Sequence, residues 1–398
     1  MAHSLKLLLV AGARPNFMKI APIIRAIRAW NATGSSGKRT LEYTLLHTGQ
    51  HYDYEMSAVF FQELDLPEPD VHMEVGSASH GEQTARVLMG IEKLLQERPP
   101  DLVMVVGDVN STLAGALAAV KLHIPVAHVE AGLRSFDRRM PEEINRLLTD
   151  AISDYLFTTS EEAADNLARE GVPREKVFFV GNVMIDNLRF FQAKLPSMNR
   201  PMPFGLGGRE YVLATLHRPS NVDVPSVLRG LLDALDEISA RAPVIFPAHP
   251  RTAKAIADLG LPVMEAADLA KAIPHTGVHM TRPLGYIDFL HLMIHAKLVL
   301  TDSGGVQEET TVLGVPCLTL RDATERPVTV NEGTNKVIGI RPSTIVEEAL
   351  KVLKADAGDR EALSLPRMWD GRAAERIVQI LAQRCASGTL KHHEQTSS

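Results

Sequence analysis

The sequence has little cysteine, no long apolar run and no excess of positive charge, and each shortage excludes a class of protein. Its two cysteines, Cys317 and Cys385, are too few for a disulfide framework and match no metal-site spacing. No apolar run reaches the roughly eighteen residues that span a bilayer, so we expect a cytoplasmic protein that binds no membrane. The net charge of −6 also argues against nucleic-acid binding, which usually needs a basic surface.

What the sequence does contain is a regular alternation of short apolar runs with amphipathic stretches. The runs that we predict to be strands are residues 5–10, 43–47, 102–106, 126–129, 155–158, 177–180, 211–215, 244–247, 278–280, 298–301 and 316–320. The stretches that we predict to be helices include residues 17–30, 81–96, 111–122 and 161–170. Continuously apolar strands that alternate with helices are typical of a parallel sheet with both faces covered, so the pattern predicts an α/β fold.

A segment rich in proline and glycine, residues 195–208, interrupts this alternation and has the character of a linker. The chain is also too long for one ordinary core. We therefore predict two Rossmann-like domains, residues 1–190 and 191–365, that face each other across a cleft. A last helix follows within residues 366–385, and residues 386–398 form a polar tail. Because ligands bind beyond the carboxyl ends of the strands in such sheets, we expect the site in the cleft.

Charged residues follow three of the predicted strands in the first half. Arg14 and Lys19 lie near a helix start, a place that suits an anion, although two solvated surface cations would show the same pattern. Asp108 ends a buried strand and, taken alone, is explained as a helix cap. Glu130 ends the next strand, and two carboxylates at one sheet edge cost energy unless they serve a purpose. Glu142 lies in a proline-initiated first helical turn, where acidic residues are ordinary.

Basic and small residues follow the predicted strands of the second half. His217 and the arginine after it end one strand, and such a pair is as often structural as functional. Ser303, Gly304 and Gly305 begin a helix. Bare amides there can hold a phosphate and glycines allow its close approach, although an ordinary N-cap would look the same. Arg326 adds a further cation at the rim.

These residues together indicate an enzyme that acts on a phosphorylated ligand, but they do not identify the reaction. No cluster of Cys and His and no HExxH pattern indicates a metal, and no G-x-S-x-G pattern indicates a serine hydrolase. We therefore expect neither a metal nor an organic cofactor.

Nine segments of the chain resemble the non-hydrolysing UDP-N-acetylglucosamine 2-epimerases, and they occur in the order of that family. The segments are GARPNFMK, HTGQHYD, VGDVNST, HVEAGLRS, MPEEINR, TLHRPSNVD, FPAHPRT, TDSGGVQEET and TERPVTVNEGTN. They extend from about residue 5 to about residue 380. The resemblance implies a GT-B-like fold in which residues 191–365 bind UDP and the C-terminal helix crosses back to the first domain. It also implies a homodimer.

The resemblance further implies roles for single residues. Asp108, Glu130 and Glu142 match the catalytic acids of the family, and His217 matches the histidine near the diphosphate. The positions that match substrate-binding residues are Arg14, Lys19, Phe289, Ser303, Gly304, Gly305, Glu309 and Arg326. Within that set, Phe289 corresponds to the aromatic position near uracil.

Some members bind a second UDP-N-acetylglucosamine as an allosteric activator beside the active site. Gln50, Arg218 and His249 match positions of that site, whereas Asp53 stands where such members carry glutamine. A second departure follows His217, where the chain reads His-Arg-Pro-Ser-Asn and many members read His-Arg-x-Glu-Asn.

In the reaction that the resemblance implies, UDP leaves C1 of the sugar, which makes the C2 proton removable and yields 2-acetamidoglucal. UDP adds back after a proton reaches the other face of C2. UDP-N-acetylglucosamine (UDP-GlcNAc) and UDP-N-acetylmannosamine (UDP-ManNAc) thereby interconvert, for polysaccharide biosynthesis. The alternatives are a GT-B glycosyltransferase that uses a UDP-sugar, a hydrolysing epimerase and a non-catalytic UDP-sugar sensor. Three acids argue against the sensor, because binding alone would not need them. A modified UDP-sugar, such as a sugar acid, is also compatible with the pattern.

Overall fold

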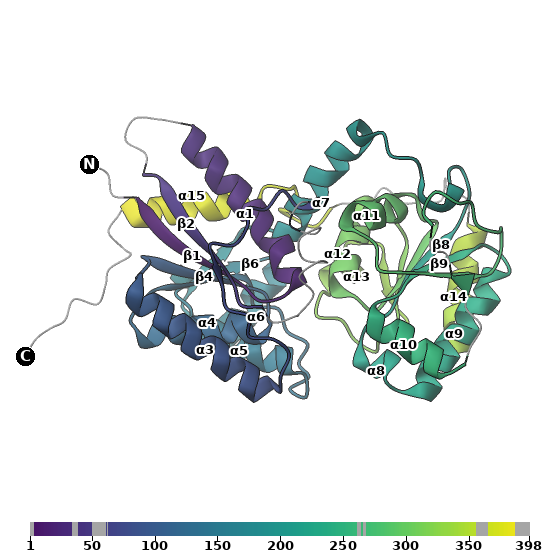
Figure 1. Cartoon of the computed structure of the whole chain (residues 1–398), viewed down its shortest axis with the longest axis horizontal. Coiled ribbons are helices and arrows are strands. Elements are labelled where there is room, and N and C mark those ends of the chain that lie inside the picture. Colours follow the sequence, from purple (N-terminus) through teal and green to yellow (C-terminus); the bar gives the residue numbers. More distant parts are fainter. Residues whose placement is uncertain are drawn as a thin grey trace, which may run out of the picture. The chain divides into compact units, whose positions relative to one another are not determined.

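The computed structural model describes residues 4–33, 39–49, 61, 63–260, 264–265, 268–355 and 365–386, apart from the side chains of residues 14, 264–265 and 385–386. The chain divides into two compact units, Met1–Asn187 with Arg367–Ser398, and Leu188–Pro366. The division falls inside one helix, α7 (Val183–Lys194). Each unit is an α/β sandwich built on its own sheet (Figure 1).

Among the described residues of the first unit, seven parallel strands form a sheet in the order β3-β2-β1-β4-β5-β6-β7. The strands are β1 (Leu5–Ala11), β2 (Leu41–His47), β3 (Val71–His72), β4 (Leu102–Val106), β5 (Val126–Ala131), β6 (Tyr155–Thr158) and β7 (Val177–Phe179). Every residue of β4 and β5 is buried. This burial explains why these strands are continuous apolar runs in the sequence, because helices cover both faces of the sheet.

The helices of the first unit pack in two groups on this sheet. They are α1 (Arg14–Ala32), α3 (His80–Glu97), α4 (Asn110–Lys121), α5 (Pro141–Ile152), α6 (Glu161–Arg169), the first part of α7, and α15 (Ala373–Ala386). Helices α3, α4 and α5 lie on one face, and α1 packs against α15 on the other (Figure 1). The carboxylate of Asp186, in α7, accepts hydrogen bonds from the amides of Ala373 (3.0 Å) and Ala374 (2.7 Å) at the start of α15. The C-terminal helix therefore belongs to the first unit.

Helix α1 begins at Arg14, three residues before the predicted start at residue 17. Pro15 is suited to the first turn because its missing amide hydrogen would have no partner there. The side-chain oxygen of Asn16 accepts from the amides of Gly12 and Ala13, both at 2.9 Å. Residues 14–16, which precede the predicted helix, thus form its first turn.

The described residues of the second unit form another sheet of seven parallel strands, in the order β10-β11-β9-β8-β12-β13-β14. The strands are β8 (Val212–Thr215), β9 (Val244–Pro247), β10 (Met264–Glu265), β11 (Val278–Thr281), β12 (Leu298–Thr301), β13 (Cys317–Thr319) and β14 (Asn335–Val337). Strands β10 and β14 were not predicted, because two or three residues are too short to show a periodic pattern.

The helices of the second unit are α8 (Pro219–Val222), α9 (Pro225–Ser239), α10 (Pro250–Asp258), α11 (Tyr286–His295), α12 (Gly304–Leu313), α13 (Val328–Asn331) and α14 (Pro342–Lys354). The segment predicted as a linker contains two short 3₁₀ helices, Leu195–Met198 and Pro203–Gly205. The core of the unit packs α9 and α14 against one face of the sheet.

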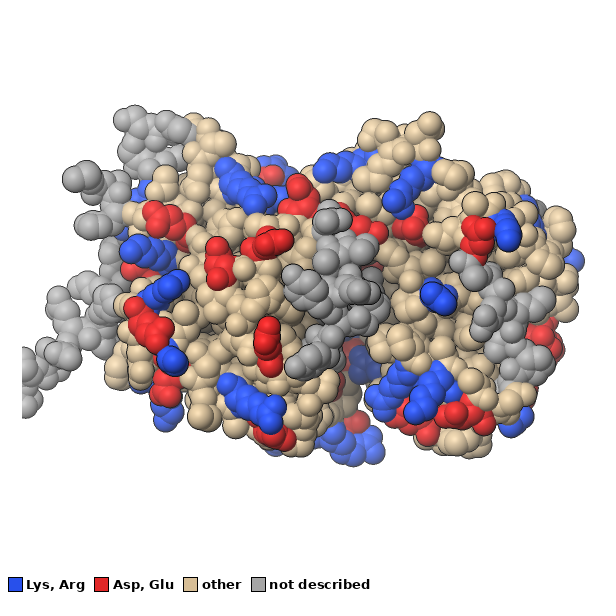
Figure 2. Space-filling model, in the orientation of Figure 1, with Lys and Arg blue, Asp and Glu red and all other residues tan. Residues whose placement is uncertain are grey.

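The first sheet reverses its strand order between β1 and β4. The second sheet does so between β8 and β12, and its order also departs from sequence at the far edge, where β11 lies between β10 and β9. In doubly wound sheets the carboxyl ends of the strands at this reversal form the usual binding site. Acidic and basic side chains are interspersed on the face shown in Figure 2. None of the helices in the described part of the chain is long and apolar enough to cross a membrane.

Candidate active site

The reversal point of the first sheet gathers Lys19, Asp108 and Glu130, which the sequence predicts as site residues. Lys19 lies in α1, which follows β1, and Asp108 follows β4. Glu130 lies near the end of β5, the neighbour of β4 in the sheet. The carboxyl ends of parallel strands meet at one edge, so residues far apart in the sequence come together there.

Lys19 and Glu130 form a buried ion pair between the lysine Nζ and the glutamate Oε2. The neighbouring Gly107 makes room for it. With a φ of +68°, Gly107 has a left-handed backbone, and a Cβ added there would lie 2.7 Å from the Lys19 Nζ. Glycine is therefore required at this position for both reasons.

The backbone of Glu130 is itself left-handed, with a φ of +74°. The strand pairing between β5 and β6 shifts register between Val129 and Ala131, on either side of this residue. A left-handed non-glycine residue costs roughly 1–3 kcal/mol and persists where its surroundings hold it. A bulge of this kind changes the direction in which a side chain points. Here the Glu130 carboxylate points toward Lys19.

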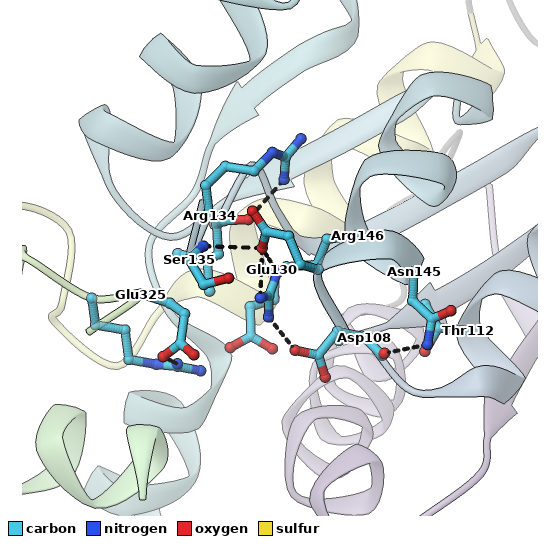
Figure 3. Close-up of polar contacts among 12 residues, drawn as sticks. Asp108, Thr112, Glu130, Arg134, Ser135, Asn145, Arg146 and Glu325 are labelled. Atoms are coloured by element: carbon cyan, nitrogen blue, oxygen red, sulfur yellow. Dashed lines mark hydrogen bonds and ion pairs between the residues drawn. The ribbon is translucent and has the colours of Figure 1, made fainter. Parts of the chain in front are cut away.

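Asp108 is paired with a different cation, Arg146 of α5. The guanidinium of Arg146 also binds Glu143 through Nη2 (2.7 Å) and Nε (3.1 Å) to one carboxylate oxygen. The side chains of Arg146 and Glu143 are 4% and 2% exposed, whereas that of Asp108 is 30% exposed. Asp108 is thus the solvent-accessible end of a buried charge network (Figure 3).

Glu143 is held as a carboxylate by its surroundings. It accepts the amides of Ser135 (3.0 Å) and Phe136 (2.9 Å) in addition to the Arg146 guanidinium. Burial alone would raise the pKa of Glu143, but the hydrogen bonds from Ser135, Arg146 and Phe136 and the charge of Arg146 outweigh it and lower that pKa below its ordinary value. The sequence prediction named Glu142 and missed this neighbour. Glu142 lies in the first turn of α5 and is partly exposed.

Side chains also hold the backbone just before and at Asp108. The carbonyl of Val106 accepts from Asn16 Nδ2 (3.0 Å) and from Thr112 Oγ1 (2.9 Å). The carbonyl of Asp108 accepts from Asn145 Nδ2 at 2.9 Å, as Figure 3 shows. Carbonyls at the end of a strand lose their partner in the ladder, so these bonds fix the peptide planes that carry the Asp108 side chain.

In the second unit, His217 is oriented by Asp302, a residue that the sequence analysis did not single out. Asp302 follows β12 and is 0% exposed. Its carboxylate accepts from the His217 Nδ1 (2.8 Å) and from the amides of His217 (3.1 Å) and Arg218 (3.0 Å). Burial would raise the pKa of Asp302, but the hydrogen bonds and the charge of His217 and the amide of Arg218 lower it. With Nδ1 directed to Asp302, the Nε2 of His217 is the ring nitrogen left for a ligand.

Helix α12 begins beside the Arg326 guanidinium. Ser303 is its N-cap, and the Ser303 side chain makes no capping hydrogen bond. A Cβ added to Gly304 would lie 2.3 Å from the Arg326 Nη1, so the guanidinium covers the first turn of the helix. Gly305 follows and is partly exposed. The first amides of a helix have no partner within it and carry partial positive charge, so this helix start and the guanidinium together suit a phosphate.

Three arginines share buried carboxylates near that helix start. Arg321 binds Glu325 through two nitrogens (2.8 and 2.7 Å), and Arg218 reaches the same carboxylate at 3.4 Å. Arg326 binds Glu308 through Nε (2.7 Å) and lies 3.6 Å from Glu325. Burial would raise the pKa of Glu325, but Arg321, Arg326 and Arg218 lower it well below its ordinary range. Arg218, predicted for an allosteric site, is thus linked to Arg326 through Glu325.

The remaining predicted residues differ in their surroundings. Glu309 is buried in α12 and accepts from the Tyr286 hydroxyl at 2.9 Å. Burial raises the pKa of Glu309 to about 7. Phe289 is partly exposed and lies in α11, which packs against α12. His249 is exposed and caps α10, accepting from the Arg251 amide at 3.4 Å.

Three predicted positions fall outside what the structure describes. Arg14 is the first residue of α1, but its side chain is not described, and Gln50 and Asp53 lie outside the described residues. Within the described ranges, no group of three or more His, Cys, Asp or Glu side chains is arranged to hold a metal ion.

A sequence model of the family described as UDP-N-acetylglucosamine 2-epimerase matches residues 35–382. The chain belongs to this family. It is 42% identical over 388 residues to the UDP-N-acetylglucosamine 2-epimerase of Methanocaldococcus jannaschii, covering 95% of this chain and 99% of that protein. It is 43% identical over 383 residues to the UDP-2,3-diacetamido-2,3-dideoxy-D-glucuronate 2-epimerase of Pseudomonas aeruginosa, covering 95% and 100%.

The structure is similar to a crystal structure of the M. jannaschii enzyme in complex with UDP-GlcNAc and UDP. The TM-score is 0.81 at 42% identity, and the match covers 95% of this chain and 100% of that one. The predicted class of fold, two Rossmann-like α/β domains of the GT-B type, is confirmed. Membership of the family makes the chain a 2-epimerase of a UDP-linked sugar.

Proposed function

We propose that the chain is a non-hydrolysing 2-epimerase that interconverts UDP-GlcNAc and UDP-ManNAc. The observation that carries the proposal is the pair of acids at the ends of neighbouring strands, Asp108 and Glu130, each bound to its own cation. Each of these acids has its own partner cation, so that one group can accept a proton and the other can donate one without strong repulsion between them. A reaction that removes a proton from one face of a carbon and returns one to the other face needs two such groups.

The reaction begins with loss of UDP, because the C2 hydrogen is not next to a carbonyl and is not acidic. The bond from C1 to the diphosphate oxygen breaks, and its electron pair leaves with UDP. A carboxylate takes the C2 proton, and the electrons of that C–H bond form the C1–C2 double bond of 2-acetamidoglucal. In the return step the second carboxyl group, in its protonated form, donates its proton to the opposite face of C2. The electron pair of the C1–C2 double bond forms the new C–H bond, and the UDP oxygen attacks C1.

The first unit supports the proton transfers. Glu130 lies beside the Lys19 ammonium, which favours the ionised form that can accept a proton. Asp108 is held by Arg146 and is partly exposed, so a substrate can reach it. Glu142 is a third candidate, in the adjacent helix α5.

The second unit supports the departure of UDP. Negative charge develops on the diphosphate as the C1–O bond breaks, and preorganised donors stabilise that charge. The amides at the start of α12, the guanidinium of Arg326 and the Nε2 of His217 are donors suited to this task. Glu309 and Phe289 are assigned to the ribose and the uracil, in line with the resemblance.

A sugar acid is the second candidate for the substrate. The observation in its favour is the 43% identity to the P. aeruginosa enzyme, whose substrate is a diacetamido-glucuronate, against 42% to the M. jannaschii enzyme. Such a substrate carries an additional carboxylate, and an additional cation would have to bind it.

The test is incubation of the full chain with each UDP-sugar in deuterated water, followed by NMR. Deuterium at C2 in a mixture of two C2 epimers supports the proposal, and the substrate that exchanges faster identifies the sugar. Free sugar with stoichiometric UDP would instead indicate a hydrolysing epimerase. Absence of C2 exchange with either sugar, together with transfer of the sugar when an acceptor is added, would overturn the proposal in favour of a glycosyltransferase. Binding of a UDP-sugar without any turnover would indicate a non-catalytic UDP-sugar sensor. The control variant is Asp233→Asn, which changes an exposed aspartate of α9.

A further inference from the structure

His128 lies inside the first unit between two hydrogen-bond acceptors. Its Nδ1 is 2.6 Å from the Asp150 Oδ1, and its Nε2 is 2.8 Å from the carbonyl oxygen of Gly107. The side chains of His128 and Asp150 are both 0% exposed. A backbone carbonyl can only accept a hydrogen bond, so Nε2 must carry a proton. If Asp150 is ionised, it too can only accept, and Nδ1 must also carry a proton.

The surroundings of Asp150 hold it in the ionised form. Its Oδ2 accepts the amide of Gly132 (3.0 Å) and lies 2.8 Å from the Arg134 Nη1. Burial would raise the pKa of Asp150, but the charges and hydrogen bonds of His128 and Arg134 lower it. Arg134 in turn binds Glu170 through Nε (2.8 Å) and Nη2 (2.6 Å). With His128 protonated, the two cations and the two carboxylates of this network balance, which is the arrangement that buried charges require.

This network touches the backbone at both acids of the site. The carbonyl that His128 binds belongs to Gly107, the residue before Asp108. The amide that Asp150 binds belongs to Gly132, two residues after Glu130. The carbonyls of Val106 and Asp108, on either side of Gly107, are held by other side chains. His128 thus completes a run of three consecutive carbonyls that are each fixed by a side chain.

We propose that His128 is a positioning residue, a buried imidazolium that fixes the Gly107 carbonyl directly and the Gly132 amide through Asp150, and so sets the places of Asp108 and Glu130. It acts through the backbone. The assignment of Asp108 and Glu130 as proton-transfer groups rests on the proposed function, but the protonation of His128 does not.

The protonation state is tested on the full wild-type chain labelled with ¹⁵N-histidine. The ring signals of His128 are identified by their loss in the His128→Gln variant, and the exposed His123 is the reference for a solvent-accessible ring. We expect both ring nitrogens of His128 to carry slowly exchanging protons, because each of them faces a buried hydrogen-bond acceptor. A His128 ring with one unprotonated nitrogen at neutral pH would overturn the proposal.

The positioning role is tested by kinetics of C2 exchange. We expect His128→Gln, which cannot serve both acceptors, to lower kcat about 100-fold while KM changes by about twofold or less, because misplaced catalytic groups slow chemistry at this scale. The side-chain amide that Asp150→Asn introduces can donate to a neutral His128 and leave the bond to Gly107 in place. We therefore expect a loss in kcat of only about tenfold for this variant.

Circular dichroism and thermal unfolding establish that both variants are folded. Unchanged kcat in a folded His128→Gln variant would overturn the positioning role, as would a rise in KM alone. If His128→Gln does not fold, the positioning role is decided by comparing kcat and KM of Asp150→Asn with those of the wild type. If the wild-type chain exchanges C2 of neither UDP-sugar, the proposed function fails, whereas the NMR result on His128 stands or falls separately.

Discussion

The two reversal points of this chain use buried charge in opposite ways. In the first unit, the acids are held by separate cations: Lys19 binds Glu130, and Arg146 binds both Asp108 and Glu143. In the second unit, the carboxylate of Glu325 gathers several arginines next to the start of α12. The same topology therefore presents a partly exposed acid in one unit and a basic helix start in the other. The difference shows how buried side chains give the same kind of sheet edge a different charge. In the proposed function, the first edge serves proton transfer and the second binds the anion.

The largest effect is expected from removing an acid of the first unit. Glu130→Gln keeps the size of the side chain but cannot accept a proton, so C2 exchange should fall by about a thousandfold, within the usual range for an acid or base group. UDP binding, measured by calorimetry, should stay close to that of the wild type. The control is Glu92→Gln, an exposed position of α3. Wild-type exchange in Glu130→Gln would remove this residue from the reaction.

The next largest effect is expected from removing the charge of Glu325, the carboxylate that binds the arginines of the second unit. Glu325→Gln leaves Arg321, Arg326 and Arg218 without their buried counter-charge, so the free energy of unfolding of the second unit should fall by about 3 kcal/mol. The depressed pKa of Glu325 means that its stabilisation is complete above the ordinary glutamate pKa and is lost as the pH falls. Because the loss begins only below the ordinary glutamate pKa, urea unfolding at about pH 7 and pH 3 should show a smaller pH dependence in the variant.

The matched control for that experiment is Glu332→Gln, at an exposed position after α13. If the free energy of unfolding depends on pH equally in Glu325→Gln and in the wild type, the Glu325 carboxylate does not stabilise the buried arginines.

A smaller effect is expected from the helix start of the second unit. Gly304→Ala places a methyl group where the Arg326 guanidinium lies, so affinity for UDP should fall about 30-fold, equivalent to roughly 2 kcal/mol. Gly207→Ala is the control, because its added methyl group meets nothing nearer than 3.8 Å. Calorimetric titration with UDP measures both. Equal losses in the two variants would mean that the position of Arg326 is unimportant for the anion.

The smallest effect is expected from Glu309. Its pKa is raised to about 7 by burial, so the protonated form stabilises the fold below the ordinary glutamate pKa, and that contribution is lost as the pH rises through about 7. Glu309→Gln should therefore be more stable than the wild type in alkaline solution, by about 1 to 2 kcal/mol. Thermal unfolding over a pH series measures this, with the exposed Glu237→Gln as control. A variant that is less stable at high pH would contradict the assignment.

The elements of the fold could be predicted because they are local. The apolar runs at β1, β4, β8 and β12 are all buried strands, and apolar runs of that length need no knowledge of distant residues. The places where the prediction of helices and strands failed also depend on a few neighbouring residues. The start of α1 depends on Pro15 and on the Asn16 hydrogen bonds to preceding amides, and β10 and β14 are too short to show a pattern.

The candidate site was predicted only as a set of strand ends. We chose Asp108, Glu130, His217 and Ser303 because they stand at the ends of predicted strands, and parallel strands bring their carboxyl ends together. That rule does not distinguish Glu142 from Glu143, since both lie in the first turn of α5 and only packing buries the second. Asp302 and Glu325 were passed over, although both directly precede residues that were chosen.

The sequence by itself determined the order of the longer strands and helices, the acids and cations at the strand ends, and the family of the chain. Only the tertiary structure decided which charges are partners. Lys19 and Glu130 are 111 positions apart, and His128 and Gly107 are 21 apart. Secondary-structure patterns report neighbours within a few residues, whereas a buried charge is stabilised by whatever group the fold brings within hydrogen-bonding distance. That physical difference explains why the acids of this enzyme were found from the sequence, whereas their pairing with Lys19 and Arg146 was not.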